Sequence, residues 1–148
     1  MPYNAKRYTS AEISSLSPGD QLVVWDHAVS EEVARAIVDF FGDSNPIHQN
    51  KEEAKRFDFS GTVVPASATF GFFTGLLGSI LPEGSVVRDI SLKFRRPIFA
   101  GQAFRIRVNF ASLEEGRLCS CKVAIYDHTS EKGMVFVHGD FSVALPRA

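Results

Sequence analysis

The sequence predicts an α+β domain in which an antiparallel sheet packs around one long apolar helix. Three features lead to this fold class. A strand and an amphipathic helix open the chain, an apolar segment of helical length follows at residues 66–81, and four runs of alternating apolar and polar residues complete it. A chain of 148 residues suits one domain, at residues 1–148, and is long enough to bury a core.

The first strand is expected at residues 21–29. A helix is expected to follow this strand. Ser30 is a typical N-cap, and Glu31 and Glu32, which come directly after it, suit the positive end of the helix dipole. Apolar residues then recur at helical spacing as far as Phe41, and Gly42 is a favourable C-terminal stop. The sequence therefore predicts an amphipathic helix with well-defined ends.

Two further helices are expected. Asn50 and the glutamate three residues later resemble a capping pair for a short helix ending near Phe57. In the apolar segment 66–81, Pro65 fits the first turn and Pro82 ends the helix. Apolar and small residues run almost all the way round this segment, which is typical of a helix buried on most sides.

The remaining segments alternate with a period of two, which indicates strands with one face buried. The four runs lie at residues 90–94, 104–110, 119–125 and 135–143. Short gaps that contain glycine favour antiparallel connections between them. A sheet that wraps around the helix at 66–81 would explain why that helix is apolar on nearly every side.

The cysteines and the net charge exclude several classes of function. Cys119 and Cys121 lie on one face of a predicted strand, and neither their spacing nor a second pair fits a zinc site, so we expect two small core residues and no metal. The net charge of −1, from 16 basic and 17 acidic residues, gives no basic excess for nucleic acid or an anionic membrane.

The N-terminal residues 1–10 are polar and lack the apolar centre of a signal peptide. The apolar segment 66–81 is interrupted by serine, threonine and glycine, which disfavours a membrane span. We therefore expect a cytoplasmic protein without membrane partners.

A loop between the first two predicted helices carries the candidate chemistry. It places a carboxylate, Asp43, five residues before an imidazole, His48. Pro46 fixes one backbone angle and biases Asn45 towards an extended shape, and Asn45 can also tighten the turn through its own side chain. A stiff loop suits an acid/base pair, since misplacement by about 1 Å can cost roughly a hundredfold in rate. From spacing alone, a surface turn with a helix-capping aspartate is the alternative.

This loop resembles the hydratase motif of the MaoC-like (R)-specific enoyl-CoA hydratases and dehydratases. The motif is Asp-x-Asn-Pro-x-His, and its fixed positions are Asp43, Asn45, Pro46 and His48. The motif in its expected place weakens the surface-turn alternative.

Two other segments carry the same resemblance. Residues 61–78 resemble the family's central helix and the turn before it, and residues 91–98 with Gly101 resemble the strand after that helix. Together the similar segments span roughly residues 20–145.

The resemblance implies a hot-dog fold, a homodimer or larger homo-oligomer, and an active site in a tunnel between subunits. It implies a hydro-lyase that interconverts trans-2-enoyl and (R)-3-hydroxyacyl thioesters carried on coenzyme A or on the phosphopantetheine of an acyl carrier protein. No metal or redox cofactor is expected. Asp43 and His48 would jointly take a proton from water and protonate C2, or perform the reverse. Their individual roles stay open.

The thioester oxygen, which becomes negative during the reaction, needs a hydrogen-bond donor. A helix N-terminus offers free amides, so the amide of Ala66, or that of Ser67, is the candidate. The family usually has His-Gly where this chain has Pro65-Ala66; proline has no N–H, and Ala66 adds a methyl group. Thr74 stands where the family often has a serine, and its hydroxyl either orients Asp43 or bonds its own helix.

Other residues near the inferred site have two interpretations each. The cations at Lys93, Arg95 and Arg96 either meet coenzyme A phosphates or form a solvated strand face. Several phenylalanines either line an acyl pocket or belong to the core and the dimer contact: Phe57, Phe59, Phe70, Phe72 and Phe73. The three histidines outside the motif are expected to be satisfied or solvated: His27, His128 and His138.

Two rival functions stay open. Other hot-dog proteins hydrolyse thioesters, usually with an acid on the central helix, but the segment 66–81 contains no Asp or Glu. The second rival is an acyl-binding or partner subunit in which Pro65-Ala66 marks a disabled oxyanion site.

Overall fold

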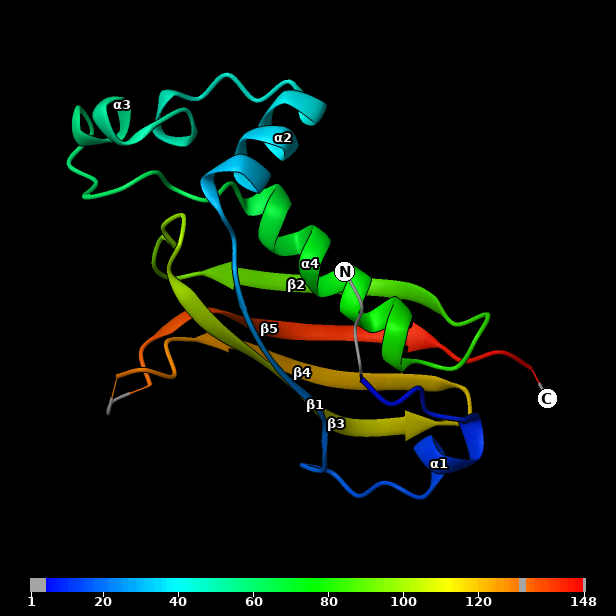
Figure 1. The fold of residues 1–148 in the computed structure, drawn as a ribbon. Helices are drawn as coiled ribbons and strands as arrows, with labels where there is room; N and C mark the ends of the chain where they lie inside the picture. Colours follow the sequence, from blue (N-terminus) through cyan, green and yellow to red (C-terminus); the bar gives the residue numbers. More distant parts are fainter. Residues whose placement is uncertain (1–4, 131–132, 148) are drawn as a thin grey trace.

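The computed structural model describes residues 5–130 and 133–147, which form a five-stranded antiparallel sheet with a long helix across one face (Figure 1). This confirms the predicted α+β class. The strands are β1 (Gln21–Ala28), β2 (Val86–Phe94), β3 (Ala103–Glu114), β4 (Leu118–Tyr126) and β5 (Val135–Ala144). The helices are α1 (Ser10–Ser14), α2 (Glu31–Phe41), α3 (Lys51–Lys55) and α4 (Ala66–Ile80), with a 3-10 turn at Pro46–His48.

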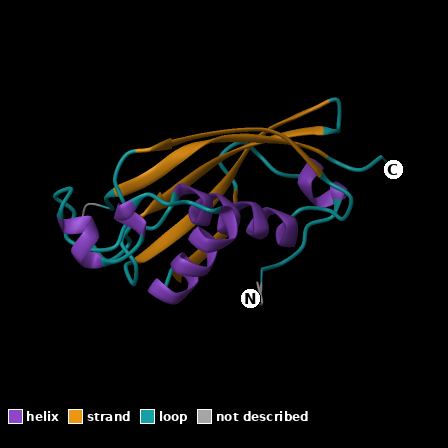
Figure 2. Cartoon of the chain, turned by 90° about the horizontal axis from the view of Figure 1, so that it is seen from above, coloured by secondary structure: helices purple, strands orange, loops and turns teal. Residues whose placement is uncertain are grey.

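The strand order β1-β3-β4-β5-β2 places the two strands that flank the helical region in sequence at opposite edges of the sheet. All neighbouring strands pair antiparallel. Figure 2 shows the long helices together on one side of the curved sheet. The core forms between that side of the sheet and α4, and its largest fully buried side chains include Phe73, Leu76, Phe104, Ile106 and Phe136.

The ends of α2 are those the sequence predicts. The hydroxyl of Ser30 accepts a hydrogen bond from the Val33 amide at 3.1 Å. Gly42 has a φ of 68°, a left-handed conformation that glycine adopts at little cost and that stops the helix. Asn50 likewise caps α3, which ends at Lys55, two residues before the expected end. Local capping interactions therefore fix where α2 ends, and the loop that follows this end carries the candidate site.

Helix α4 is buried on one side only in this chain, although burial on most sides was expected. Its inward face carries Phe73, Leu76 and Ile80, each 0% exposed. Its opposite face is exposed and composed largely of small residues: Ala66, Gly71, Gly75 and Gly78, with Phe70 among them. The sheet covers one side of the helix because all five strands lie on that side.

Strand β2 is also more exposed than its alternating pattern suggests. Ile90 and Leu92 are half-buried, and Phe94 is 49% exposed. The reason is that β2 lies at the edge of the sheet, next to β5, in the strand order of the described residues. Its contact with β5 is nonetheless very close at Gly139, which pairs with Leu92.

Substitution of Gly139 is expected to weaken this strand contact strongly. A Cβ atom at Gly139 would collide with the backbone carbonyl oxygen of Ser91 and lie 3.0 Å from the Leu92 Cα. A backbone carbonyl cannot rotate away as a side chain can, so we expect Gly139→Ala to lower the free energy of unfolding by about 3 kcal/mol. Chemical denaturation measures this change. The control is Gly61→Ala, whose methyl group would meet Phe99 at an ordinary 3.5 Å; equal stability of the two variants would contradict the prediction.

The two cysteines are core residues, as predicted. Cys119 and Cys121 are 0% and 1% exposed, and their sulfur atoms lie 3.7 Å apart as free thiols. The contact with the Cys119 sulfur, together with burial, raises the pKa of the Cys121 thiol. Because both thiols are buried away from any ligand, neither cysteine is a candidate nucleophile.

Within residues 5–130 and 133–147, no helix is long and apolar enough to cross a membrane. The same residues contain no group of three or more His, Cys, Asp or Glu side chains arranged to hold a metal ion.

Candidate active site

The loop after α2 brings the two candidate catalytic side chains together. The Nε2 atom of His48 lies 3.6 Å from the Oδ2 atom of Asp43. The His48 side chain is 11% exposed and that of Asp43 is 33% exposed. The two groups are therefore close enough to act on one small molecule, and both remain reachable.

Backbone contacts hold Asp43 in place. Its amide donates to the Val38 carbonyl at 3.0 Å, which completes the end of α2. Its Oδ1 atom accepts a hydrogen bond from the Asn45 amide at 3.0 Å, and its carbonyl accepts one from the Gln49 side chain at 3.3 Å. One carboxylate oxygen is thus bound by the loop, which leaves Oδ2 facing His48.

Asn45 connects the two members of the pair. Its side-chain oxygen accepts from the Ile47 amide at 3.4 Å, and its carbonyl accepts from the His48 amide at 3.1 Å. Pro46 occupies the first position of the 3-10 turn, where its fixed φ suits the turn and no N–H is needed. Asn45 therefore fixes Asp43 through its amide and the turn that carries His48 through its side chain.

A backbone carbonyl that the sequence did not reveal orients the His48 ring. The Nδ1 atom of His48 lies 2.7 Å from the carbonyl oxygen of Val63. A carbonyl can only accept, so Nδ1 carries a hydrogen and the Nε2 atom of the neutral ring is the one left to exchange protons. Val63 is itself held by its bridge to Phe99 and by a bond from its amide to the Ile47 carbonyl at 3.0 Å. No side-chain motif could have indicated this contact.

A cavity of about 330 Å³ adjoins His48. Both His48 and Ala66, the first residue of α4, contribute to its wall, whereas Asp43 stands beside His48 outside the lining of the cavity in this chain. The other lining residues are mostly apolar: Phe59, Val63, Val64, Thr69, Phe94, Arg95, Arg96, Pro97 and Ile98. An apolar cavity with a few polar groups is the usual form of a small-molecule site.

The N-terminus of α4 offers hydrogen-bond donors to this cavity. The amides of Ala68 and Thr69 both bond to the Pro65 carbonyl, at 3.0 and 3.4 Å. In the described part of the chain, the amides of Ala66 and Ser67 have no recorded acceptor, as expected for the first turn of a helix. Of these two free amides at the positive end of the helix, that of Ala66 belongs to a residue that lines the cavity.

Thr74 bonds its own helix. Its hydroxyl lies 2.9 Å from the Phe70 carbonyl and 3.2 Å from the Gly71 carbonyl, and the described residues show no hydrogen bond from it to Asp43. An orienting role for Thr74 thus stays a prediction, while the alternative bond within α4 is present.

The phenylalanines named from the sequence divide between cavity, core and surface. Phe59 lines the cavity, and Phe73 is fully buried and packs edge-on against Phe141. Phe72 contacts His27 at 4.6 Å between ring centroids. Phe57 and Phe70 are 49% and 43% exposed.

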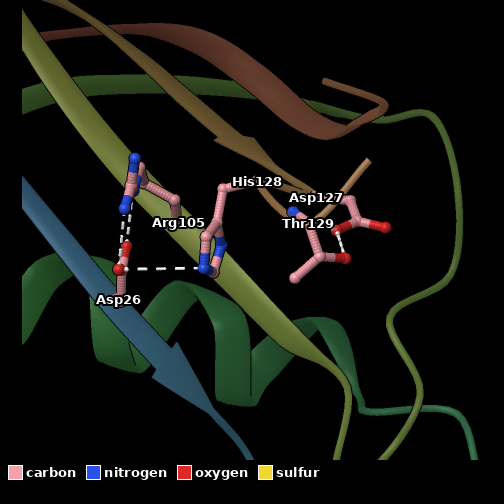
Figure 3. A network of polar contacts seen from close by, with 5 residues as sticks. All are labelled: Asp26, Arg105, Asp127, His128 and Thr129. Carbon is pink, nitrogen blue, oxygen red and sulfur yellow. Dashed lines mark hydrogen bonds and ion pairs between the residues drawn. The ribbon is translucent and has the colours of Figure 1, made fainter. Parts of the chain in front are cut away.

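The three remaining histidines have other surroundings. His27 stacks on Trp25, and burial lowers its pKa. The Nε2 atom of His128 lies 3.8 Å from Asp26, which is bound at both carboxylate oxygens by Arg105 (Figure 3). The Arg105 hydrogen bonds are the main reason that the pKa of Asp26 is lowered. His138 accepts a hydrogen bond from Arg95 at 3.0 Å.

Solved structures define the class of fold. An (R)-hydratase of Aeromonas caviae involved in PHA biosynthesis is similar with a TM-score of 0.78 and 26% identity, covering 89% of this chain and 98% of that one. An R-hydratase from Pseudomonas aeruginosa gives 0.79 at 16% identity, over 92% and 86% of the two chains. A MaoC-like dehydratase from Rhodospirillum rubrum gives 0.75 at 19% identity, over 91% and 97%. The fold is the hot-dog fold, as the resemblance predicts.

Sequence comparison defines the family. The model of the MaoC like domain matches residues 23–132. A curated (R)-specific enoyl-CoA hydratase of Aeromonas caviae is 30% identical over 106 residues, which are 70% of this chain and 77% of the relative. The chain therefore belongs to the MaoC-like domain family, which confirms the family predicted from the loop motif.

Proposed function

We propose that this protein is a hydro-lyase that interconverts trans-2-enoyl and (R)-3-hydroxyacyl thioesters carried on coenzyme A or phosphopantetheine. The observation that carries the proposal is the 3.6 Å distance between the Asp43 carboxylate and the His48 ring nitrogen Nε2. His48 lines a cavity whose wall also includes Ala66, the first residue of α4. The similarity to an (R)-specific enoyl-CoA hydratase supports the substrate class and the stereochemistry.

Hydration requires two proton transfers that the dyad is arranged to share. The oxygen of water bonds to C3 while one water proton passes to the dyad and the electrons of the C2–C3 double bond move into an enolate. The dyad then gives a proton to C2, which completes the saturated product. The Nε2 atom of neutral His48 can accept that proton, because its Nδ1 hydrogen is bound to Val63. The carboxylate of Asp43 stabilises the resulting positive charge or holds the water directly. Dehydration uses the same steps in reverse.

The negative charge of the intermediate enolate falls on the thioester oxygen. We assign its stabilisation to the amide of Ala66, with that of Ser67 as the alternative donor, because both are free at the positive end of α4. Pro65 contributes no N–H, and its carbonyl accepts hydrogen bonds from the amides of Ala68 and Thr69, which leaves the amides of Ala66 and Ser67 for substrate.

The proposed reaction adds or removes water by proton transfer and a carbon–oxygen bond change, with no net oxidation or reduction, so we propose that it uses neither a metal ion nor a redox cofactor. We further propose a homodimer that covers the exposed face of α4. Two glycines on that face, Gly71 and Gly78, have no atoms within 4 Å of an added Cβ, so a second backbone could approach closely.

A spectrophotometric assay of the purified protein with a crotonyl thioester tests this function. The expected result is loss of the enoyl absorbance without release of free thiol, and chiral analysis should show the (R)-3-hydroxyacyl product. Release of free thiol with the carbon–carbon double bond retained in the free acid would instead identify a thioesterase. Tight binding of the thioester without turnover would identify an acyl-binding subunit. Either result would contradict the proposal.

A further inference from the structure

A second hollow adjoins the cavity at His48. It measures about 960 Å³ and is lined by Arg95, Arg96, Ser130, Gly133, Met134, Val135 and His138. Arg95 and Arg96 line the His48 cavity as well. The two arginines therefore stand at the junction of two adjoining spaces, an inner one with the dyad and an outer one along β5.

The backbone holds both arginines at this junction. They follow the end of β2 at Phe94, and their amides donate to a single acceptor, the Phe136 carbonyl, at 2.7 and 3.2 Å. The Nε atom of Arg95 also donates to Nε2 of His138 at 3.0 Å. This bond uses one nitrogen of the Arg95 guanidinium and leaves its two terminal nitrogens to meet a ligand.

The charges of Arg95 and Arg96 are not neutralised by the protein. Both side chains are exposed, and over residues 5–130 and 133–147 no acidic group lies within ion-pair distance of either. Arg105 contrasts with them, since Asp26 occupies two of its nitrogens at 2.6 and 2.8 Å (Figure 3). Two adjacent free guanidinium groups are well suited to phosphate, which they can bind through paired hydrogen bonds.

We propose that Arg95 and Arg96 bind the phosphate of the substrate's carrier while the thioester occupies the His48 cavity. The inference rests on the proposed function, because it takes that cavity to hold an acyl thioester. Coenzyme A and acyl carrier proteins present the same chemistry here: a thiol joined through a flexible amide arm to a phosphate. The outer hollow gives the carrier a partly apolar wall at Met134 and Val135.

Direct binding tests the inference without requiring turnover. Calorimetry would compare pantetheine, 4′-phosphopantetheine and coenzyme A as ligands of the full chain, its R95Q/R96Q double variant and a control, Arg117→Gln. Arg117 is an exposed arginine in the β3–β4 turn, at the other end of β4 from the hollow. We expect the wild type and the control to prefer phosphorylated ligands by about tenfold or more, the size of one charge-assisted hydrogen bond. The double variant should lose this preference.

The ligands also separate the two sources of phosphate. Equal preference for phosphopantetheine and coenzyme A would assign the contact to the phosphate of the arm, which both carriers share. Preference for coenzyme A alone would assign it to the phosphates of the nucleotide. The inference is overturned if the wild type shows no preference for phosphorylated ligands, or if the double variant retains it.

Kinetics keeps this inference distinct from the proposed function. In an active enzyme, R95Q/R96Q should raise the KM for crotonyl-CoA far more than it lowers kcat, and should change the KM for crotonyl-pantetheine little. An active wild type without phosphate preference would refute the arginine site alone. An arginine-dependent preference in a protein that never hydrates enoyl thioesters would refute the proposed function alone.

Discussion

Loss of the His48 imidazole is expected to lower kcat for enoyl-thioester hydration by about a thousandfold, the usual scale for a general acid/base group. His48→Ala removes the only ring nitrogen that the Val63 contact leaves available to exchange protons near Asp43. Asp43→Asn should lower kcat by about a hundredfold, because it removes the charge but keeps an oxygen able to accept the Asn45 amide. Steady-state assays with a crotonyl thioester measure both effects.

The control for these variants lies in the same loop. Ser44 is exposed, and within residues 5–130 and 133–147 no hydrogen bond joins it to another residue, so Ser44→Ala should keep both the loop and the activity. Denaturation curves would show whether each variant retains the fold. Wild-type rates in folded His48→Ala and Asp43→Asn proteins would end the assignment of the dyad.

The next largest effect is expected from Ala66→Pro, which removes a backbone N–H without changing a polar side chain. If the Ala66 amide holds the enolate oxygen, kcat should fall by about a hundredfold, as when one oxyanion donor is lost elsewhere. Helix α4 should remain folded, because proline is favoured at the first helical position. The preceding Pro65 already has the extended ψ of 148° that a following proline requires.

Ala66→Gly is the matched variant, because it keeps the backbone amide and removes only the methyl group. Glycine is the residue that the family usually has at this position, after a histidine. It should retain the oxyanion contact and hydrate crotonyl thioesters at least as fast as the wild type. An unchanged kcat in Ala66→Pro would move the contact to the Ser67 amide and contradict the assignment to Ala66.

Features of the fold that depend on neighbouring residues were predictable from the sequence. The ends of α2 follow from the Ser30 cap and the left-handed Gly42, and the strands follow from alternation. Helix α1 was missed, although Thr9 and Glu12 form a capping box whose spacing is visible in the sequence.

Features set by tertiary contacts were not predictable. The edge position of β2, and with it the exposure of Phe94, follows from its pairing with β5, which no local pattern specifies. The one-sided burial of α4 has the same origin. The apolar pattern of a helix shows which of its faces are apolar, but it does not show which strand or which other chain packs against each face.

The candidate site also has some features that the local sequence predicts and others that depend on tertiary contacts. The motif predicted that Asp43 and His48 lie close together, because Asn45 and Pro46 stiffen a short loop by local bonds. The hydrogen bond between His48 and the Val63 carbonyl could not be predicted. Val63 is held in place by its bridge to Phe99, which lies far along the chain. The shared position of Arg95 and Arg96 between two hollows likewise required the structure.

The most direct test of the catalytic assignment is a crystal structure with an unreactive enoyl-thioester analogue bound. The expected complex has the thioester oxygen on the order of 3 Å from the Ala66 amide, with C3 facing the space between Asp43 and His48. An analogue bound away from the His48 cavity, or one whose reactive carbons point away from both side chains, would show that this loop does not perform the chemistry.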